Sequence, residues 1–167
     1  AKAVEWNGHE NSRGVGAYAN YWFDWFWKEP VAGDAPANIV LDTDDILAFL
    51  DIRPVTRGHV LVIPKAHSTD LESLEPSIGQ AMFDAGQQIA KALRRSDLRA
   101  DGSNLVLNDG KAAFQTVFHT HLHVVPRWNG DKLRFVAGFL TRRPKNQEAT
   151  AEAIRAGMER LAAEDHR

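Results

Sequence analysis

The segment QTVFHTHLHVVPR, residues 115–127, carries a histidine at every second position. The three are His119, His121 and His123, out of seven histidines in the whole chain. Side chains alternate between the two faces of a β-strand, so rings spaced in this way would share one face, about 7 Å apart. The apolar residues that would point the other way, towards a core, are Phe118, Leu122 and Val124. The pattern predicts a cluster of imidazole groups on one side of a strand.

Such a cluster suits chemistry at phosphorus. Imidazole is the side chain whose ordinary pKa lies nearest neutrality. One neutral ring can attack phosphorus while a neighbouring ring donates a proton or binds phosphate oxygens. Three adjacent rings cannot all carry a charge cheaply, so the roles of neutral nucleophile and cationic acid would be divided among them.

Two other interpretations of the cluster stay open. Three histidines could share a face by accident. Alternatively, His-x-His on a strand is a known spacing for zinc ligands. A zinc site needs a third ligand and usually a supporting carboxylate, for which His59 and Asp51 are candidates.

Composition narrows the class of protein. The chain has 167 residues, 44% hydrophobic and 25% charged, which is typical of one soluble domain. Its net charge of −2, without a basic stripe, argues against a nucleic-acid groove. No apolar run is long enough to predict a membrane span, and no secretory signal is expected. Because cysteine is absent, disulfides and thiol chemistry are excluded, and we expect a cytoplasmic location.

The pattern of apolar residues predicts an α+β fold with a mainly antiparallel sheet, because short strands outnumber helices and do not alternate with them. The expected strands are 38–42, 46–51, 59–64, 103–108 and 116–127. Helices are expected over 74–98 and 149–165. The buried stripe predicted for the first helix is Ile78, Met82, Ala85, Ile89, Ala92 and Leu93.

The composition along the chain suggests three parts. Residues 1–20 are rich in glycine, asparagine and charge, as in a mobile arm. Residues 21–131 would form the catalytic domain, and 132–167 a C-terminal extension with a helix.

The sequence HTHLHVV (119–125) resembles the His-x-His-x-His-x-x signature of the histidine triad family. Three further segments resemble conserved blocks of that family, in the same order: DIRPVTRGHVLVIPKAH (51–67), LNDGKAAFQTVFH (107–119) and PRWNGD (126–131). Together the similarity spans about residues 31–131, over half of the chain.

The resemblance implies a five-stranded antiparallel sheet with one long helix, paired as a homodimer. It also implies hydrolysis or transfer at the α-phosphorus of a purine nucleotide. By position, His121 would be the nucleophile that forms a covalent nucleotidyl-histidine. His123 would hold a phosphate oxygen and assist the leaving group, while His119 would orient the cluster. His59 matches the family's fourth active-site histidine.

The resemblance also assigns nucleotide-binding positions. Asp51 would bind the ribose hydroxyls, since a carboxylate can accept both hydrogen bonds of a diol. Phosphate contacts would come from Asn108, Gln115 and Thr116. The apolar walls of a base pocket would be Trp27, Val31, Phe49 and Ile52. No cofactor and no metal are expected.

This chain departs from the family pattern in three places. Many members carry Cys-x-x-Cys near the start, sometimes with zinc, but here that region reads WFDWFWKE, so no zinc site is expected there. Phe114 stands where a glycine is common, so either the loop differs or Phe114 tolerates a strained backbone. The tail from about residue 132 has no evident family match.

The sequence therefore favours an enzyme that cleaves either nucleoside phosphoramidates or dinucleoside polyphosphates. A nucleotide-binding or partner-binding module with vestigial catalysis is the alternative of a different class. A metal-dependent hydrolase is the third.

Overall fold

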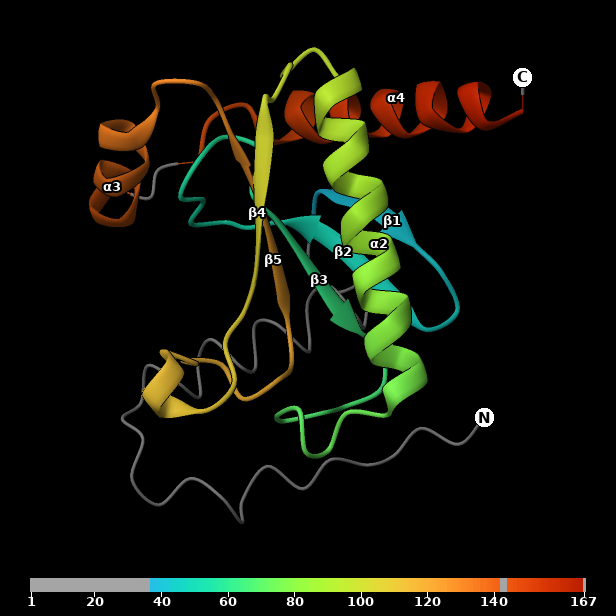
Figure 1. The fold of residues 1–167 in the computed structure, drawn as a ribbon, viewed down its shortest axis with the longest axis vertical. Helices are drawn as coiled ribbons and strands as arrows, with labels where there is room; N and C mark the ends of the chain where they lie inside the picture. Colours follow the sequence, from blue (N-terminus) through green and yellow to red (C-terminus); the bar gives the residue numbers. More distant parts are fainter. Residues whose placement is uncertain (1–36, 142–143, 167) are drawn as a thin grey trace.

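The computed structural model describes residues 37–141 and 144–166 (Figure 1). The predicted arm, the tryptophan-rich segment, Trp27 and Val31 lie outside the described residues. In chain order the elements are β1 (Ile39–Asp42), β2 (Ile46–Leu50), β3 (Val60–Pro64), α2 (Pro76–Arg95), β4 (Gly102–Leu107), the short 3-10 helix η2 (Lys111–Ala113), β5 (Leu122–Arg127), α3 (Lys132–Thr141) and α4 (Gln147–Asp165).

The five strands form one antiparallel sheet, as predicted, and their order in it is β1-β2-β3-β5-β4. β5 lies between β3 and β4, so the last strand in sequence is inserted into the sheet rather than added to its edge. In this register His123 of β5 stands between Leu61 of β3 and Val106 of β4. The third histidine of the triad is thereby fixed on a central strand.

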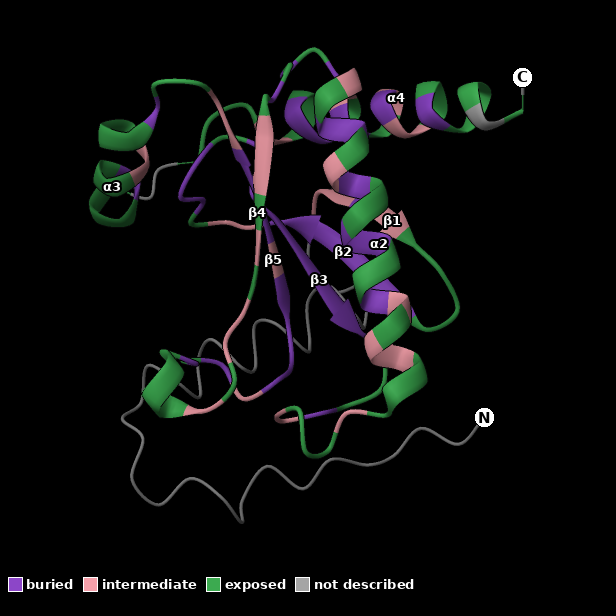
Figure 2. Cartoon of the chain, in the orientation of Figure 1, coloured by how far each residue is buried: buried purple, intermediate pink, exposed green. Residues whose placement is uncertain are grey.

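The two faces of the sheet bury different residues, because side chains alternate along each strand. One face packs against α2 and α4, and its core includes Val60, Val62 and Val124 with Ile89 of α2 and Ile154 of α4. The opposite face carries a second apolar cluster, made of Leu47, Phe49, Leu61, Ile63 and Val117. In Figure 2, β2, β3 and most of β5 are coloured as buried, and these strands together contribute to both cores. His123, one residue from Val124, belongs to the face away from α2.

Helix α2 forms where the apolar periodicity predicted it. Pro76 sits in its first turn, where a missing N–H costs nothing, and Arg94 and Arg95 occupy its last turn, where positive charge is favourable. Met82, Ala85, Ile89, Ala92 and Leu93 of the predicted stripe are buried, and Ile78 is partly buried against the same core.

The fifth strand is shorter than predicted. It begins at Leu122, not at residue 116, so only His123 of the three histidines lies on a strand. The expectation that all three share one strand face is therefore wrong. The segment before β5 bonds to a loop instead, because the N–H of Thr120 donates to the carbonyl of Ser68 at 2.6 Å. Phe118, expected to face the core, lies in this segment and is only half-buried.

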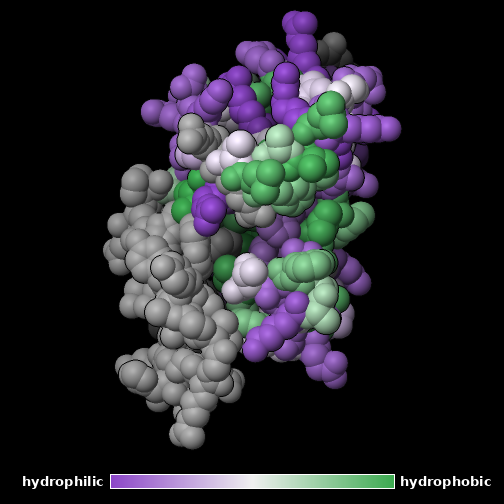
Figure 3. Space-filling view, turned by 90° about the vertical axis from the view of Figure 1, so that its left-hand side faces the viewer, coloured by the Kyte–Doolittle hydropathy of each residue, from purple (hydrophilic) through white to green (hydrophobic). Residues whose placement is uncertain are grey.

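Helix α3 is an element that the sequence analysis did not predict. Its glycine, Gly138, packs so closely that a Cβ there would stand 2.0 Å from the carbonyl oxygen of Val55. Its N-terminal side is held by Arg127, whose guanidinium lies 3.7 Å above the ring centroid of Phe135. Large apolar side chains on this helix are exposed, namely Leu133, Val136, Phe139 and Leu140. Figure 3 views the side of the molecule where α3 lies in Figure 1 and shows apolar side chains gathered there.

The second predicted helix is present as α4, beginning two residues earlier than expected. Among the described residues, no helix combines the length and apolarity that a bilayer crossing requires.

Candidate active site

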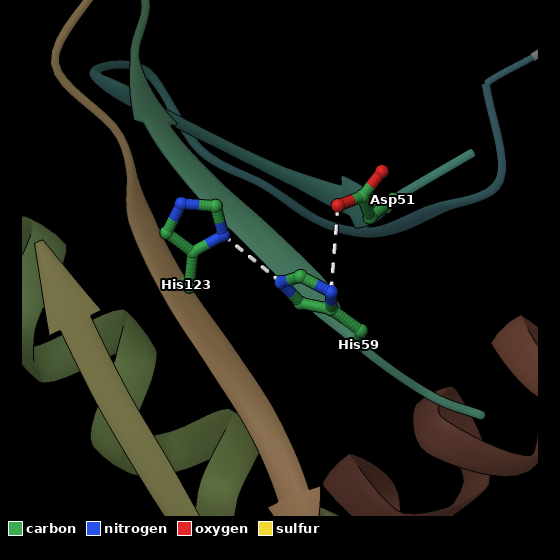
Figure 4. Close-up of side chains that lie close together, drawn as sticks. All are labelled: Asp51, His59 and His123. Carbon is green, nitrogen blue, oxygen red and sulfur yellow. Dashed lines mark hydrogen bonds and ion pairs between the residues drawn. The ribbon is translucent and has the colours of Figure 1, made fainter. Parts of the chain in front are cut away.

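Two histidines that are far apart in sequence meet on the sheet face opposite α2. His59 directly precedes β3 and His123 lies within β5, which pairs with β3. Their side chains touch through Nε2 of His59 and Nδ1 of His123, 2.9 Å apart (Figure 4). The sheet therefore joins two predicted site residues that are 64 positions apart in sequence.

Nδ1 of His59 has two neighbours of opposite character. The backbone N–H of Val55 donates to it at 3.2 Å, which requires an unprotonated nitrogen. Oδ2 of Asp51 lies 3.4 Å from the same atom, which suits a protonated ring. His59 thus has a suitable partner in both charge states. When Nδ1 of a neutral ring accepts from Val55, Nε2 carries the hydrogen and donates to His123; when Nδ1 carries the hydrogen, it faces Asp51.

His121 is almost fully buried and its orientation is set by the backbone. Nδ1 lies 2.7 Å from the carbonyl oxygen of His119. Because a carbonyl can only accept, Nδ1 must carry the hydrogen, and a neutral ring then keeps a lone pair on Nε2. Burial lowers the pKa of His121, which favours the neutral ring at pH 7. The rings of His121 and His123 stand edge to face, with centroids 4.8 Å apart.

His119 is buried and supports the site through its hydrogen bonds. Its side chain is 2% exposed, and Nε2 donates to the carbonyl oxygen of Pro64 at 3.0 Å. Burial lowers the pKa of His119 to about 4, so the ring is neutral at pH 7. One residue thus holds the end of β3 with its side chain and the ring of His121 with its carbonyl group.

We expect His119 to make folding stability depend on pH. The ordinary pKa of 6.5 applies to the unfolded chain, whereas the folded value is about 4. Between these values the unfolded chain binds more protons, so stability falls as pH falls. His119 alone should cost about 2 kcal/mol of unfolding free energy between pH 7 and pH 5. The glutamine amide of His119→Gln can still donate to Pro64 but does not titrate. For this variant, urea denaturation should show a drop in unfolding free energy between pH 7 and pH 5 that is smaller by about 2 kcal/mol. An unchanged loss in the variant would contradict this prediction.

The loop from Asn108 to Val117 is organised by Gln115, which is 4% exposed. Its Oε1 accepts from the N–H of Gly110 at 2.7 Å, and its Nε2 donates to the carbonyls of Thr69 and Val117. Gln115 therefore holds the loop closed. Of the other two predicted phosphate contacts, Asn108 is half-buried just after β4 and Thr116 is exposed.

Phe114, in the same loop, adopts the left-handed conformation with φ 65°. This is the region that favours glycine, and it accounts for the glycine usual at this position. The Phe114 side chain is 85% exposed, so no packing of that side chain explains the strained backbone.

Asp51 is positioned by a contact within its own turn and by a contact with a residue far away in sequence. Its Oδ1 accepts from the N–H of Arg53 at 2.7 Å, and its carbonyl accepts from Nε2 of Gln147 at 2.8 Å. Gln147 begins α4, so the C-terminal extension supports the site. Of the predicted base-pocket residues, Ile52 is half-buried, whereas Phe49 is fully buried in the second apolar cluster.

Several residues that support the site were not predicted. They are Val55, Ser68, Thr120 and Gln147. The hydroxyls of Ser68 and Thr120 lie 3.0 Å apart and join the histidine segment to the loop after β3. No sequence pattern distinguishes these four residues, except that Ser68 and Thr120 are small residues with a hydroxyl group.

A model of the HIT domain, the histidine triad domain, matches residues 32–130. The chain belongs to the HIT domain family. An uncharacterised HIT-like protein of Mycobacterium tuberculosis is 49% identical over 135 residues, covering 81% of this chain and 91% of that protein. A zinc-bound histidine triad family protein from Mycobacterium smegmatis, known from its crystal structure, is 51% identical with a TM-score of 0.74. That match covers 80% of this chain and 92% of the other.

A third HIT relative carries the name of an enzyme. Adenylylsulfatase HINT3 of Arabidopsis thaliana is 36% identical over 110 residues, which cover 62% of this chain and 55% of the plant protein. The HIT fold expected from the sequence is thus confirmed, with the triad segment inside the matched range.

Proposed function

We propose that this protein is a nucleotide hydrolase or nucleotidyl transferase that acts at the α-phosphorus of purine nucleotide conjugates through a covalent intermediate on His121. The observation that carries the proposal is the bond from Nδ1 of His121 to the carbonyl of His119, at 2.7 Å. It leaves the lone pair on Nε2, and burial keeps the ring neutral by lowering its pKa. A neutral imidazole with a fixed tautomer is a competent nucleophile.

In the first step Nε2 of His121 forms a bond to phosphorus, and the bond to the leaving group breaks. The leaving group takes the Nε2 proton of His123. The Nε2 proton of His59 then moves across the 2.9 Å contact to Nδ1 of His123. This transfer requires a cationic pair at the start, and Asp51, 3.4 Å from Nδ1 of His59, stabilises that charge. Both rings are neutral afterwards.

In the second step a water attacks phosphorus and the bond to His121 breaks, so the lone pair returns to Nε2. The now unprotonated Nε2 of His123 accepts the proton of the water as a general base. An acceptor other than water would give nucleotidyl transfer by the same route.

The remaining contacts follow from the same proposal. The carboxylate of Asp51, which also faces His59, accepts hydrogen bonds from the ribose hydroxyls. Asn108 and Thr116 contact phosphate oxygens at the mouth of the site. Gln115 supports them by holding the loop, because its amide groups bond to the backbone.

Three substrate classes fit this chemistry: nucleoside phosphoramidates, dinucleoside polyphosphates and, from the name of the Arabidopsis relative, adenylyl sulfate. All of them present a nucleotidyl group with a leaving group on its α-phosphorus. They differ in the charge and size of that leaving group.

The test is AMP release from adenosine phosphoramidate, diadenosine tetraphosphate and adenylyl sulfate, with and without chelator. We expect release that survives chelator, and retention of configuration at a chiral α-phosphorothioate, because two displacements each invert it. Release with net inversion would exclude the covalent intermediate. Binding of AMP without turnover of any substrate would favour the binding module, and activity lost in chelator would favour a metal-dependent hydrolase.

We also propose a homodimer, as the family resemblance implies. β4 is an edge strand of the sheet, and Val106 on it is 44% exposed. Phe83 on α2, a helix that contacts β4, is 56% exposed, so these two elements together expose two large apolar side chains. Light scattering should give twice the chain mass of 18.6 kDa. A mass near 18.6 kDa would exclude the dimer.

A further inference from the structure

We propose that Asp51, His59 and His123 bind a divalent transition-metal cation, and that the bound cation blocks the nucleotide site. The cation site stands on the geometry of these three side chains alone. The blocking effect also rests on the function proposed above.

The three side chains converge closely enough to share one ion. Each offers a ligand atom, and these atoms all lie within 4.8 Å of one another. Nε2 of His59 and Nδ1 of His123 are 2.9 Å apart. Two ligands held about 2.1 Å from one cation stand about 3.0 to 3.4 Å apart. The rings therefore need to separate by only a few tenths of an ångström, and a turn of the Asp51 side chain brings in the carboxylate.

The chemistry of the donors selects the class of cation. Two imidazoles and one carboxylate suit Zn²⁺, Co²⁺ or Ni²⁺, whereas Mg²⁺ and Ca²⁺ prefer oxygen ligands. His59 is 3% exposed, but Asp51 is 14% exposed, so one side of the site is reached from solvent. Water can complete the coordination there. This site uses no residue of the region where the family's Cys-x-x-Cys is missing.

A cation at this place is incompatible with the proposed reaction. It takes the position of the proton that His59 and His123 share, so the leaving group cannot be protonated by that route. It also occupies the carboxylate that accepts the ribose hydroxyls. A chelator should then raise the rate of a metal-containing preparation, which is the opposite of its effect on a metal-dependent hydrolase.

The binding test is a Co²⁺ titration of the full chain, followed by visible absorption and by displacement with Zn²⁺. His59→Ala should weaken Co²⁺ binding by about 100-fold. The matched control is His67→Ala, because His67 and His119 form another pair of rings, with centroids 5.5 Å apart. That variant should bind as the wild type does. Asp51→Asn, nearer to solvent, should also weaken binding, which keeps the test decisive if His59→Ala fails to fold.

Three binding results would each overturn the cation site: unchanged Co²⁺ affinity in Asp51→Asn, unchanged Co²⁺ affinity in folded His59→Ala, or loss of Co²⁺ binding in His67→Ala. For the blocking effect, AMP should raise the apparent Kd for Co²⁺, and Zn²⁺ should inhibit AMP release. Simultaneous binding of AMP and Co²⁺ would refute the blocking effect. If no substrate is turned over at any metal concentration, yet Co²⁺ binding depends on His59, the proposed function fails while the cation site stands.

Discussion

Replacing His121 with alanine should reduce AMP release by at least about 10⁴-fold, since the nucleophile of a two-step reaction has no substitute. AMP affinity should stay within about tenfold of the wild type. The reason is that His121 presents only Nε2 to the substrate, while its Nδ1 is bonded to the backbone of His119. The measurements are single-turnover AMP release and equilibrium binding of AMP.

The control for this prediction is His67→Ala, an exposed histidine in the loop after β3. It should keep the wild-type rate, because the proposed mechanism does not use it. Acid-quenched wild type should retain the labelled adenylyl group on protein, and His121→Ala should not. If the alanine variant still turned over substrate within tenfold of the wild type, a direct attack by water would replace the covalent mechanism.

Gly157→Ala should destabilise the fold by about 3 kcal/mol, through overpacking between α4 and α2. A Cβ at this position would stand 2.3 Å from the carbonyl oxygen of Ala92, a backbone atom that cannot rotate away. Relief of this overlap requires the two helices to move apart, although they share the core that contains Ile154. The urea midpoint of unfolding measures the effect.

A second helical glycine offers the matched control. At Gly79, in α2, the nearest atom to an added Cβ is Cδ2 of Leu74 at 3.3 Å, the end of a flexible side chain. Gly79→Ala should therefore stabilise the protein by up to about 1 kcal/mol, because alanine favours the helix. Equal effects at both positions would show that helix propensity, and not packing against Ala92, decides the outcome.

The sequence predicted the sheet and the long helix because their signals are local. The apolar runs of β2 and β3 and the three-four spacing along α2 each need only neighbouring residues to be recognised. The start of β5 was misplaced for a physical reason. Alternating histidines also suit an extended segment that bonds through Thr120 to Ser68, and periodicity cannot distinguish that segment from a strand.

The sequence indicated which residues to expect at the candidate site, but not the contacts between them. The pairing of His59 with His123 follows from the sheet order, which no local pattern contains. The contact from Gln147 to the carbonyl of Asp51 joins residues 96 positions apart. Helix α3 was missed although Leu133, Val136 and Leu140 stand at helical spacing, in a segment of only ten residues whose apolar side chains face solvent.

The insertion of β5 between β3 and β4 has a consequence for how the site comes into being. Residues 60–62 pair with residues 122–124, so this ladder closes a loop of about sixty residues, at an entropic cost that short hairpins avoid. The hairpin of β1 and β2 and the helix α2 can form from neighbouring segments before that closure. His59 and His123 cannot meet until it occurs. Under the proposed function, recovery of AMP release during refolding should report this long-range closure, whereas far-UV circular dichroism should report the local elements.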